Sequence, residues 1–201
     1  EPHRRMVLER LEPALAARLI GAMSADEQAD LFRELPRPAR ERLLAALDDA
    51  SRGAMQLLLG YAPETAAGIM TTEFAAVAGH WTVARVVEHL RQIAQVKETI
   101  YAVYVVAPET RRLEHVVSLR ELLIADPAAL VRHVAPKRKL ITIPPEASHG
   151  EAARVIGKYN LLAVPVVDAE GRILGIVTVD DIIDAMVSEQ TEQVQRLGGV
   201  E

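Results

Sequence analysis

An internal duplication constrains the fold of this chain more than any other feature. In the first copy the pattern predicts a helix, two strands and a helix, at residues 82–94, 100–106, 113–119 and 119–125. In the second copy the same elements are predicted at residues 148–160, 162–168, 173–179 and 179–197, after a short strand at 140–143. Val116–Glu121 corresponds to Ile176–Asp181 in residue type at every position except Arg120, which aligns with Asp180. Two similar β-α-β-β-α units in tandem therefore predict an α+β fold.

The first 62 residues carry helical periodicity and almost no strand signal. Three twelve-residue blocks, 24–35, 36–47 and 48–59, each end in Leu and begin with a capping residue or a first-turn Pro. Such blocks predict short helices stacked in a superhelix, each burying its neighbour's face. Because the first helix begins almost at residue 1, we expect further helices upstream in a longer protein.

These patterns divide the chain into four parts. We expect a helical N domain at 1–62, the first repeated unit at 63–130, the second at 131–190, and the start of a connecting helix at 191–201. The last of these continues the helix that follows Thr178. Its apolar face carries Ile182, Ile183 and Met186, which we expect to pack against a second chain.

Carboxylates cover the opposite face of this last helix. They are Asp180, Asp181, Asp184, Glu189 and Glu192. An acidic stripe on a helix is either solvated surface or a site for cations, and periodicity alone does not separate the two.

Composition excludes several classes of function. The net charge of −5, with two Phe and one Trp, argues against nucleic-acid binding. The six His residues show no metal-binding spacing and there is no Cys, so a transition-metal site is not expected. No phosphate-binding loop, dinucleotide fingerprint or nucleophile motif is present, and we therefore do not expect an enzyme. The longest apolar run, 161–167, is too short to span a bilayer.

The repeated motifs resemble those of a known family. The pair of units, with Gly175-Ile-Val-Thr-Val-Asp-Asp181 closing the second, resembles a tandem pair of CBS domains. Gly68-Ile-Met-Thr-Thr-Glu-Phe74 and Val164-Pro-Val-Val-Asp168 further resemble the MgtE family of magnesium channels, and the resemblance covers nearly the whole chain. It implies the cytosolic regulatory region of such a channel, a homodimer through its CBS domains at the cytoplasmic face of the cell membrane, with its own transmembrane domain beyond this chain.

The resemblance also implies a set of Mg²⁺ ligands. The N domain would contribute Asp26 and Asp30, and Gly68 would contribute its backbone carbonyl. The second CBS domain and the helix after it would contribute Asn160, Asp181, Asp184, Glu189 and Glu192. Asn160 stands where the family often has Asp, and Gly150 where a carboxylate is expected. Oxygen ligands of this kind suit Mg²⁺, which bridges acidic faces that otherwise repel each other.

Two acidic residues in the repeats have a second interpretation. Ser118 with Glu121, and Thr178 with Asp181, match a helix capping box. In CBS domains the same acid holds ribose hydroxyls, and some MgtE members bind ATP in the first CBS domain, with Arg120 and Glu121 at the matching positions. An adenine-nucleotide sensor (ATP or AMP) is therefore the alternative function, although Ala102 stands where an aromatic residue would stack on the base.

Overall fold

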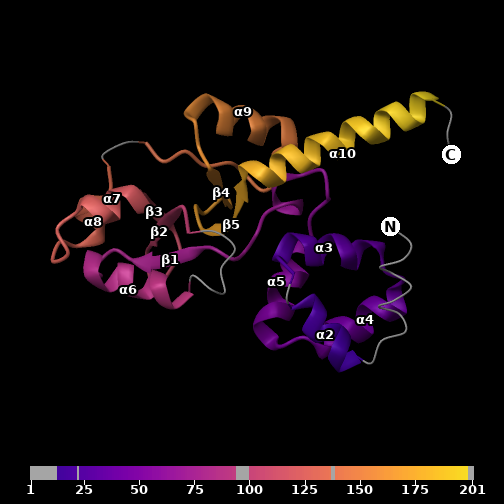
Figure 1. Cartoon of the computed structure of the whole chain (residues 1–201), viewed down its shortest axis with the longest axis horizontal. Coiled ribbons are helices and arrows are strands. Elements are labelled where there is room, and N and C mark those ends of the chain that lie inside the picture. Colours follow the sequence, from indigo (N-terminus) through magenta and orange to yellow (C-terminus); the bar gives the residue numbers. More distant parts are fainter. Residues whose placement is uncertain (1–12, 22, 94–99, 137–138, 199–201) are drawn as a thin grey trace.

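The computed structural model describes residues 13–21, 23–93, 100–136 and 139–198. For parts of α2 and α10, including residues 189–190 and 192–198, it describes the backbone alone. Helices form the N-terminal part, and two small mixed units follow it, with a long C-terminal helix extending away from them (Figure 1). The predicted α+β architecture is confirmed.

The N-terminal part consists of α2 (Pro13–Ile20), α3 (Ala25–Glu34), α4 (Arg37–Ala46) and α5 (Asp49–Leu59). The last three begin directly after Ser24, Pro36 and Asp48, the residues expected to start each twelve-residue block. Ser24 forms a capping box with Glu27, and the Asp48 carboxylate accepts from the Ser51 N–H. One helix per block agrees with the repeat, and the helices pack mainly as alternate pairs, α3 against α5 and α2 against α4.

The first CBS unit contains β1 (Ala75–Ala78), α6 (Val83–Ile93), β2 (Ala102–Val106), β3 (Leu113–Ser118) and α7 (Leu119–Ile124). Its three strands lie in the order β1-β2-β3, the first pair parallel and the second antiparallel. Val77, Val103, Val105 and Val117 of these strands form a separate core with Val83, Val86 and Leu90 of α6. This is the order of elements that the first copy predicts.

The second unit contains α8 (Val131–Val134), α9 (His149–Tyr159), β4 (Ala163–Val167), β5 (Ile173–Thr178) and α10 (Val179–Gly198). The strand expected at 140–143 is wrong, because Ile143 forms only a single parallel bridge, to Val166. Pairing cannot continue beyond Ile143, since Pro144 and Pro145 have no N–H to donate.

The segment between the N-terminal helices and β1 pairs with the second unit. Its short 3-10 helix η1 (Ala66–Gly68) donates from Ala66 N–H to the Ala147 carbonyl at 2.7 Å. Thr71 exchanges two backbone hydrogen bonds with Ile176 of β5, at 2.9 and 3.0 Å. This segment therefore ties the N-terminal helices to the second repeat, which is far away in the sequence.

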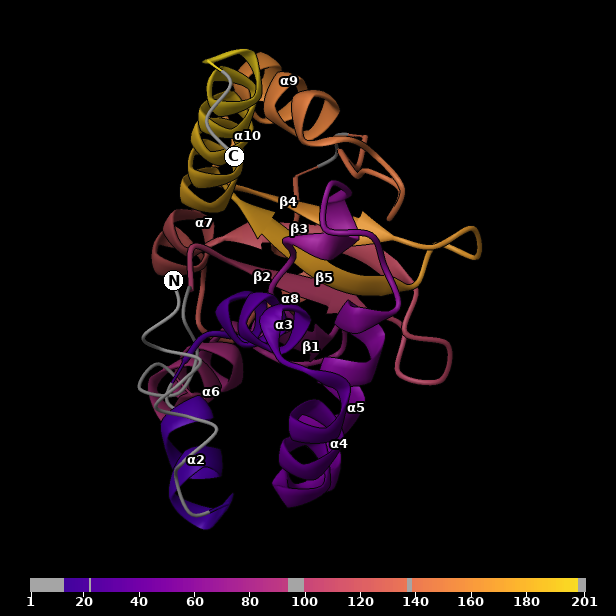
Figure 2. The ribbon, with the colours of Figure 1, turned by 90° about the vertical axis from the view of Figure 1, so that its right-hand side faces the viewer.

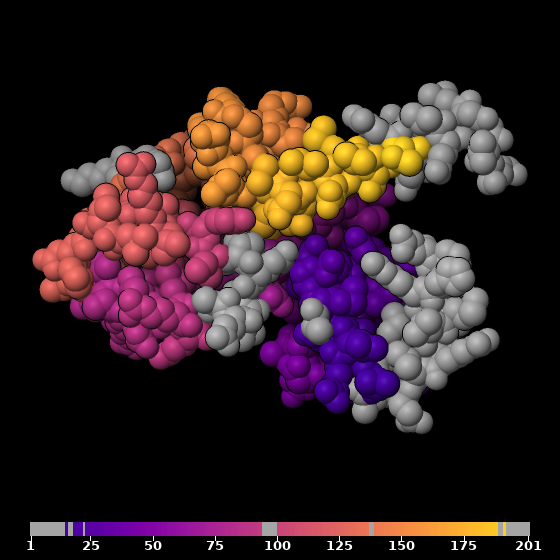
Figure 3. Space-filling view, viewed as in Figure 1, coloured from indigo at the N-terminus to yellow at the C-terminus, as the bar shows by residue number. Residues whose placement is uncertain are grey.

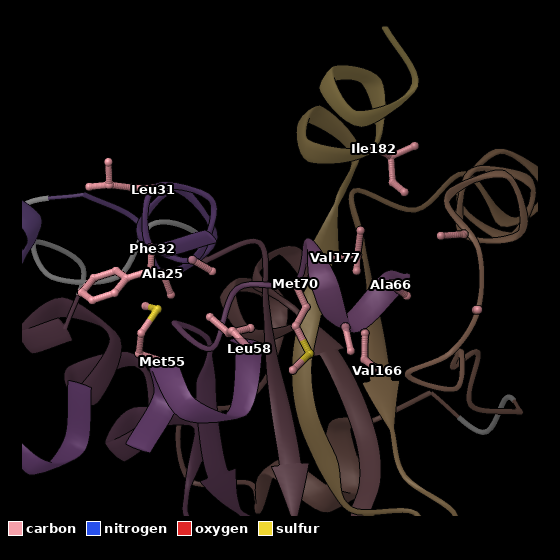
Figure 4. Packing of buried hydrophobic residues seen from close by; sticks show 14 of the residues in the cluster. Ala25, Leu31, Phe32, Met55, Leu58, Ala66, Met70, Val166, Val177 and Ile182 are labelled. Carbon is pink, nitrogen blue, oxygen red and sulfur yellow. The ribbon is translucent and has the colours of Figure 1, made fainter. Parts of the chain in front are cut away.

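Buried apolar side chains continue along the same route. Phe32 and Leu58 of the N-terminal helices, Met70 of the connecting segment and Val177 of β5 belong to one core (Figure 4). A smaller core joins the two sheets, where Phe74 and Tyr104 of the first unit meet Ile176 of the second. The sheets lie next to each other with helices outside them (Figure 2). None of the helices, over the length that is described, is long and apolar enough to cross a bilayer.

Candidate functional site

An acidic pocket of about 400 Å³ lies where α3 faces the start of α10. Its lining residues are Asp26, Glu27, Asp30, Pro63, Glu64, Ile69, His149, Asp181, Asp184, Ala185 and Ser188. Figure 3 shows α10 running over the N-terminal helices at this place. Four of the carboxylates expected to bind Mg²⁺, which come from opposite ends of the chain, are therefore brought together here. No lysine or arginine among the described residues lines the pocket.

The joint between β5 and α10 positions Asp181. The Thr178 hydroxyl, at the last residue of β5, donates to the Asp181 carboxylate in the first turn of the helix. The pKa of Asp181 is raised to about 6, mainly because burial disfavours the charged form, and the charges of Asp26 and Asp180 add to this. The Thr178 hydrogen bond opposes the shift. Asp181 is thus an ionisable group held in a site that disfavours its negative charge.

Asp26 faces Asp181 from α3, and its negative charge is disfavoured in the same way. Burial raises its pKa, and a hydrogen bond from Ser24 opposes the shift. Its buried Oδ1 has no hydrogen-bond partner within the described part of the chain. An unsatisfied, partly desolvated carboxylate oxygen opposite a second carboxylate is suited to a hard cation, so the residues present fit Mg²⁺.

The pocket does not contain a complete set of protein ligands for a metal. Within the described residues, no three His, Asp or Glu side chains gather tightly enough to hold an ion by themselves. Mg²⁺ usually keeps several waters and needs only one or two carboxylates. The arrangement therefore suits a hydrated ion between α3 and α10 rather than a closed protein cage.

Gly68 lies beside the pocket and does not line it. A Cβ at this buried position would lie 2.2 Å from the Ala62 carbonyl oxygen, so only glycine fits. Its own carbonyl accepts a hydrogen bond from Arg33 at 3.0 Å. The oxygen expected to bind Mg²⁺ is therefore occupied by an arginine in this structure.

The remaining expected metal ligands lie elsewhere. Asn160 is exposed and ends α9 in the left-handed conformation, at φ 49° and ψ 51°, and it does not line the pocket. It is therefore not brought together with Asp26 and Asp181, and its role as a metal ligand stays a prediction. Glu189 and Glu192 are on α10 beyond the pocket, and their side chains lie outside the described residues.

Sequence reasoning missed three ionisable groups of the pocket, of which Glu27 is the residue after Asp26 on α3. Glu64 comes from the connecting segment and His149 from the first turn of α9. The buried His149 ring donates from Nε2 to the Pro63 carbonyl at 3.0 Å and so joins these two segments. Neither Glu64 nor His149 belongs to a periodic acidic face, and only the pairing of the connecting segment with the second unit places them here.

A second cavity of about 400 Å³ lies between the two CBS units. Its lining includes His115 from β3, Lys139 and Ile141 from the segment before α9, and Tyr159 at the end of α9. Arg120 and Glu121 do not line it. Glu121 accepts from the Ser118 N–H at 2.7 Å and from its hydroxyl at 2.8 Å, so this pair forms the capping box.

Comparison with known proteins agrees with this architecture. Residues 1–64 match the family described as the MgtE intracellular N domain, and residues 66–127 and 131–188 each match the CBS domain family. The chain is 36% identical to the magnesium transporter MgtE of Thermus thermophilus, over 99% of its own length and 50% of that protein. It is 40% identical to MgtE of Enterococcus faecalis, over 74% of its length and 32% of that protein. The chain thus spans half or less of these relatives.

Two solved structures share the fold at similar identity. The soluble part of a magnesium transporter superimposes with a TM-score of 0.86 at 36% identity, covering 92% of this chain and 72% of that one. The cytosolic domain of the Mg²⁺ channel MgtE in complex with ATP superimposes with a TM-score of 0.69 at 35% identity, covering 91% and 84%.

Proposed function

Since the chain belongs to the MgtE family, with an MgtE intracellular N domain followed by two CBS domains, we propose that it senses Mg²⁺ as the regulatory region of a magnesium channel or transporter. It has no catalytic role in this proposal. It acts at the cytoplasmic face of the membrane, on a transmembrane domain that would follow α10.

The observation that carries the proposal is the acidic pocket between α3 and α10. Asp26 and Asp30 lie one turn apart on α3, and Asp181 and Asp184 lie three residues apart on α10. The raised pKa values of Asp26 and Asp181 indicate that negative charge is disfavoured at this contact. A bound divalent cation supplies the positive charge that removes this penalty. The N domain then stays against α10, and at low Mg²⁺ repulsion separates the two.

The long helix α10 carries this signal. It begins at the pocket and extends away from the CBS units, toward the position where a membrane domain would follow (Figure 1). Holding α3 against the first turns of α10 restricts how that helix moves, and we place the closed pore in this restricted state. Glu189 and Glu192 are proposed to bind further Mg²⁺ between two chains.

A second copy of the chain is the partner in this proposal. Large apolar side chains are exposed on two helices, by 55% to 78% of their surface: Ile183 and Val187 on α10, and Leu123 and Ile124 on α7. Exposed apolar surface of this kind is typical of a protein interface. Ile182 was expected on this surface but is buried in its own chain, at 3% exposure. The dimer surface therefore uses Ile183 and Val187, with Met186 at its edge.

Small-angle scattering across a Mg²⁺ titration at constant ionic strength tests this function. We expect a saturable fall in the radius of gyration at constant mass in the low-millimolar range. The pair Asp26→Asn with Asp181→Asn should abolish it, because both facing charges are gone. The control pair Asp49→Asn with Glu109→Gln removes two exposed carboxylates outside the pocket and should respond like the wild type. A double pocket variant that compacts at the wild-type concentration would refute the ligand assignment.

The second candidate function is adenine-nucleotide sensing. The cavity between the CBS units favours it, because Lys139 and His115 provide polar groups beside apolar walls, and a similar domain has been solved with ATP. We expect ATP to bind with a midpoint that depends on Lys139, measured by calorimetry with Lys139→Met. Arg91→Met, which removes an exposed cation on α6 outside the cavity, is the control. Binding that persists unchanged in Lys139→Met places the nucleotide elsewhere. In this case Arg120 and Glu121 become the next residues to test.

A further inference from the structure

Arg33 forms an ion pair with Asp30, a carboxylate that lines the acidic pocket. Its Nη1 donates to the Asp30 carboxylate at 2.7 Å and to the Gly68 carbonyl at 3.0 Å, and its Nη2 donates to the Leu58 carbonyl at 3.1 Å. The Arg33 side chain is 18% exposed, whereas that of Asp30 is 66% exposed. One guanidinium therefore joins α3, the end of α5 and η1, and its anionic partner is a residue that lines the pocket.

The pocket itself holds six carboxyl groups. They belong to Asp26, Glu27, Asp30, Glu64, Asp181 and Asp184. A divalent cation that enters this space and reaches Asp30 meets the positive charge of Arg33 on the same carboxylate. Like charges at this distance repel, and the low exposure of the guanidinium limits screening by water.

The guanidinium does not depend on Asp30 to stay in place. If the carboxylate turns to another cation, Nη1 keeps the Gly68 carbonyl and Nη2 keeps the Leu58 carbonyl. Leu58 is in the last turn of α5, where the helix dipole favours a positive charge. After an exchange of partners each terminal nitrogen of Arg33 still has one backbone acceptor, which limits the cost of the exchange.

We propose that Arg33 competes with Mg²⁺ for the Asp30 carboxylate and thereby sets the concentration at which the pocket fills. This inference rests on the proposed function, because it assigns a regulator to the same site. At low Mg²⁺ the arginine holds Asp30, and at high Mg²⁺ the ion takes its place beside Asp30.

Calorimetric titration of the chain with Mg²⁺ at constant ionic strength tests the proposal. Arg33→Met should lower the Mg²⁺ midpoint about three- to tenfold, because the Asp30 carboxylate, which is 66% exposed, loses a competing unit charge. Arg33→Lys keeps a positive charge beside Asp30 and should lower the midpoint less than Arg33→Met does. Arg37→Met removes the same charge from an exposed ion pair with Glu41 on α4 and should leave the midpoint unchanged.

Each outcome separates this inference from the proposed function. A saturable wild-type response with equal midpoints in Arg33→Met and Arg37→Met overturns the competition and leaves Mg²⁺ sensing intact. A higher midpoint in Arg33→Met shows that the arginine only holds the pocket together, and it also overturns the competition. If the wild type shows no saturable response to Mg²⁺, both the competition by Arg33 and the proposed Mg²⁺ sensing are refuted. If Arg33→Met does not fold, as judged by thermal unfolding in EDTA, Arg33→Gln replaces it, since an amide can still donate to the Gly68 carbonyl.

Discussion

Replacing Asp181 by Asn is expected to make the protein more stable when no divalent cation is present. The wild-type carboxylate is partly desolvated and faces Asp26, which raises its pKa from 3.8 to about 6. Asn removes the charge, keeps the shape and still accepts the Thr178 hydrogen bond. After discounting the pKa shift for the part of the side chain that water reaches, we expect a gain of about 1–2 kcal/mol at neutral pH.

The sign of the pH dependence follows from the direction of this shift. The native state binds the Asp181 proton more tightly than the unfolded chain, so the free energy of unfolding falls as the pH rises from 3.8 to about 6. The penalty is complete above that window and absent below it. The difference between Asp181→Asn and wild type should therefore be near zero at low pH and reach its full size by neutral pH.

Thermal unfolding in EDTA and in saturating Mg²⁺ measures both effects. In EDTA at neutral pH, Asp181→Asn should melt roughly 2 to 8 °C higher than wild type. Mg²⁺ should then raise the melting temperature of the wild type and change that of Asp181→Asn little. Glu109→Gln, which removes an exposed carboxylate in the turn between β2 and β3, is the control for loss of charge. An Asn variant that is less stable than wild type at every pH would contradict the charge penalty that we assign to Asp181.

Replacing Gly68 by Ala is expected to lower the free energy of unfolding more than any other substitution proposed for this protein. Its Cβ would lie 2.2 Å from the Ala62 oxygen and 2.8 Å from the Pro63 Cα. These are backbone atoms and cannot turn aside, so η1 must move, and with it the carbonyl that Arg33 binds. We expect a loss of about 3 kcal/mol, or roughly 6 to 12 °C in melting temperature.

Gly53→Ala is the matched control for this substitution. Gly53 lies inside α5, and nothing lies within 4 Å of a Cβ there. Alanine favours helix over glycine, so this variant should gain about 0.5–1 kcal/mol. Equal melting temperatures for Gly68→Ala and wild type would show that the connecting segment rearranges at little cost. The Gly68 carbonyl would then not be a fixed acceptor for Arg33, which the Arg33 proposal requires.

Local rules were enough to predict most elements. Ser24, Pro36 and Asp48 start helices because capping and a fixed backbone angle act within a few residues. The two repeated units were predicted in order, since alternation and helical periodicity are also local. The strand expected at 140–143 is reduced to the single bridge of Ile143, and the two prolines after it prevent the pairing from continuing.

The sequence by itself determined most of the helices and strands and the acidic faces, including Asp26 with Asp30 and Asp181 with Asp184. Only the tertiary structure decided that these faces meet in one pocket, because the pairing of Thr71 with Ile176 brings the N-terminal helices to the second repeat. It also decided that Arg33 holds Asp30 and the Gly68 carbonyl, and that Asn160 lies outside the pocket. Contacts between residues far apart in the chain depend on packing and charge across elements, which no local pattern encodes.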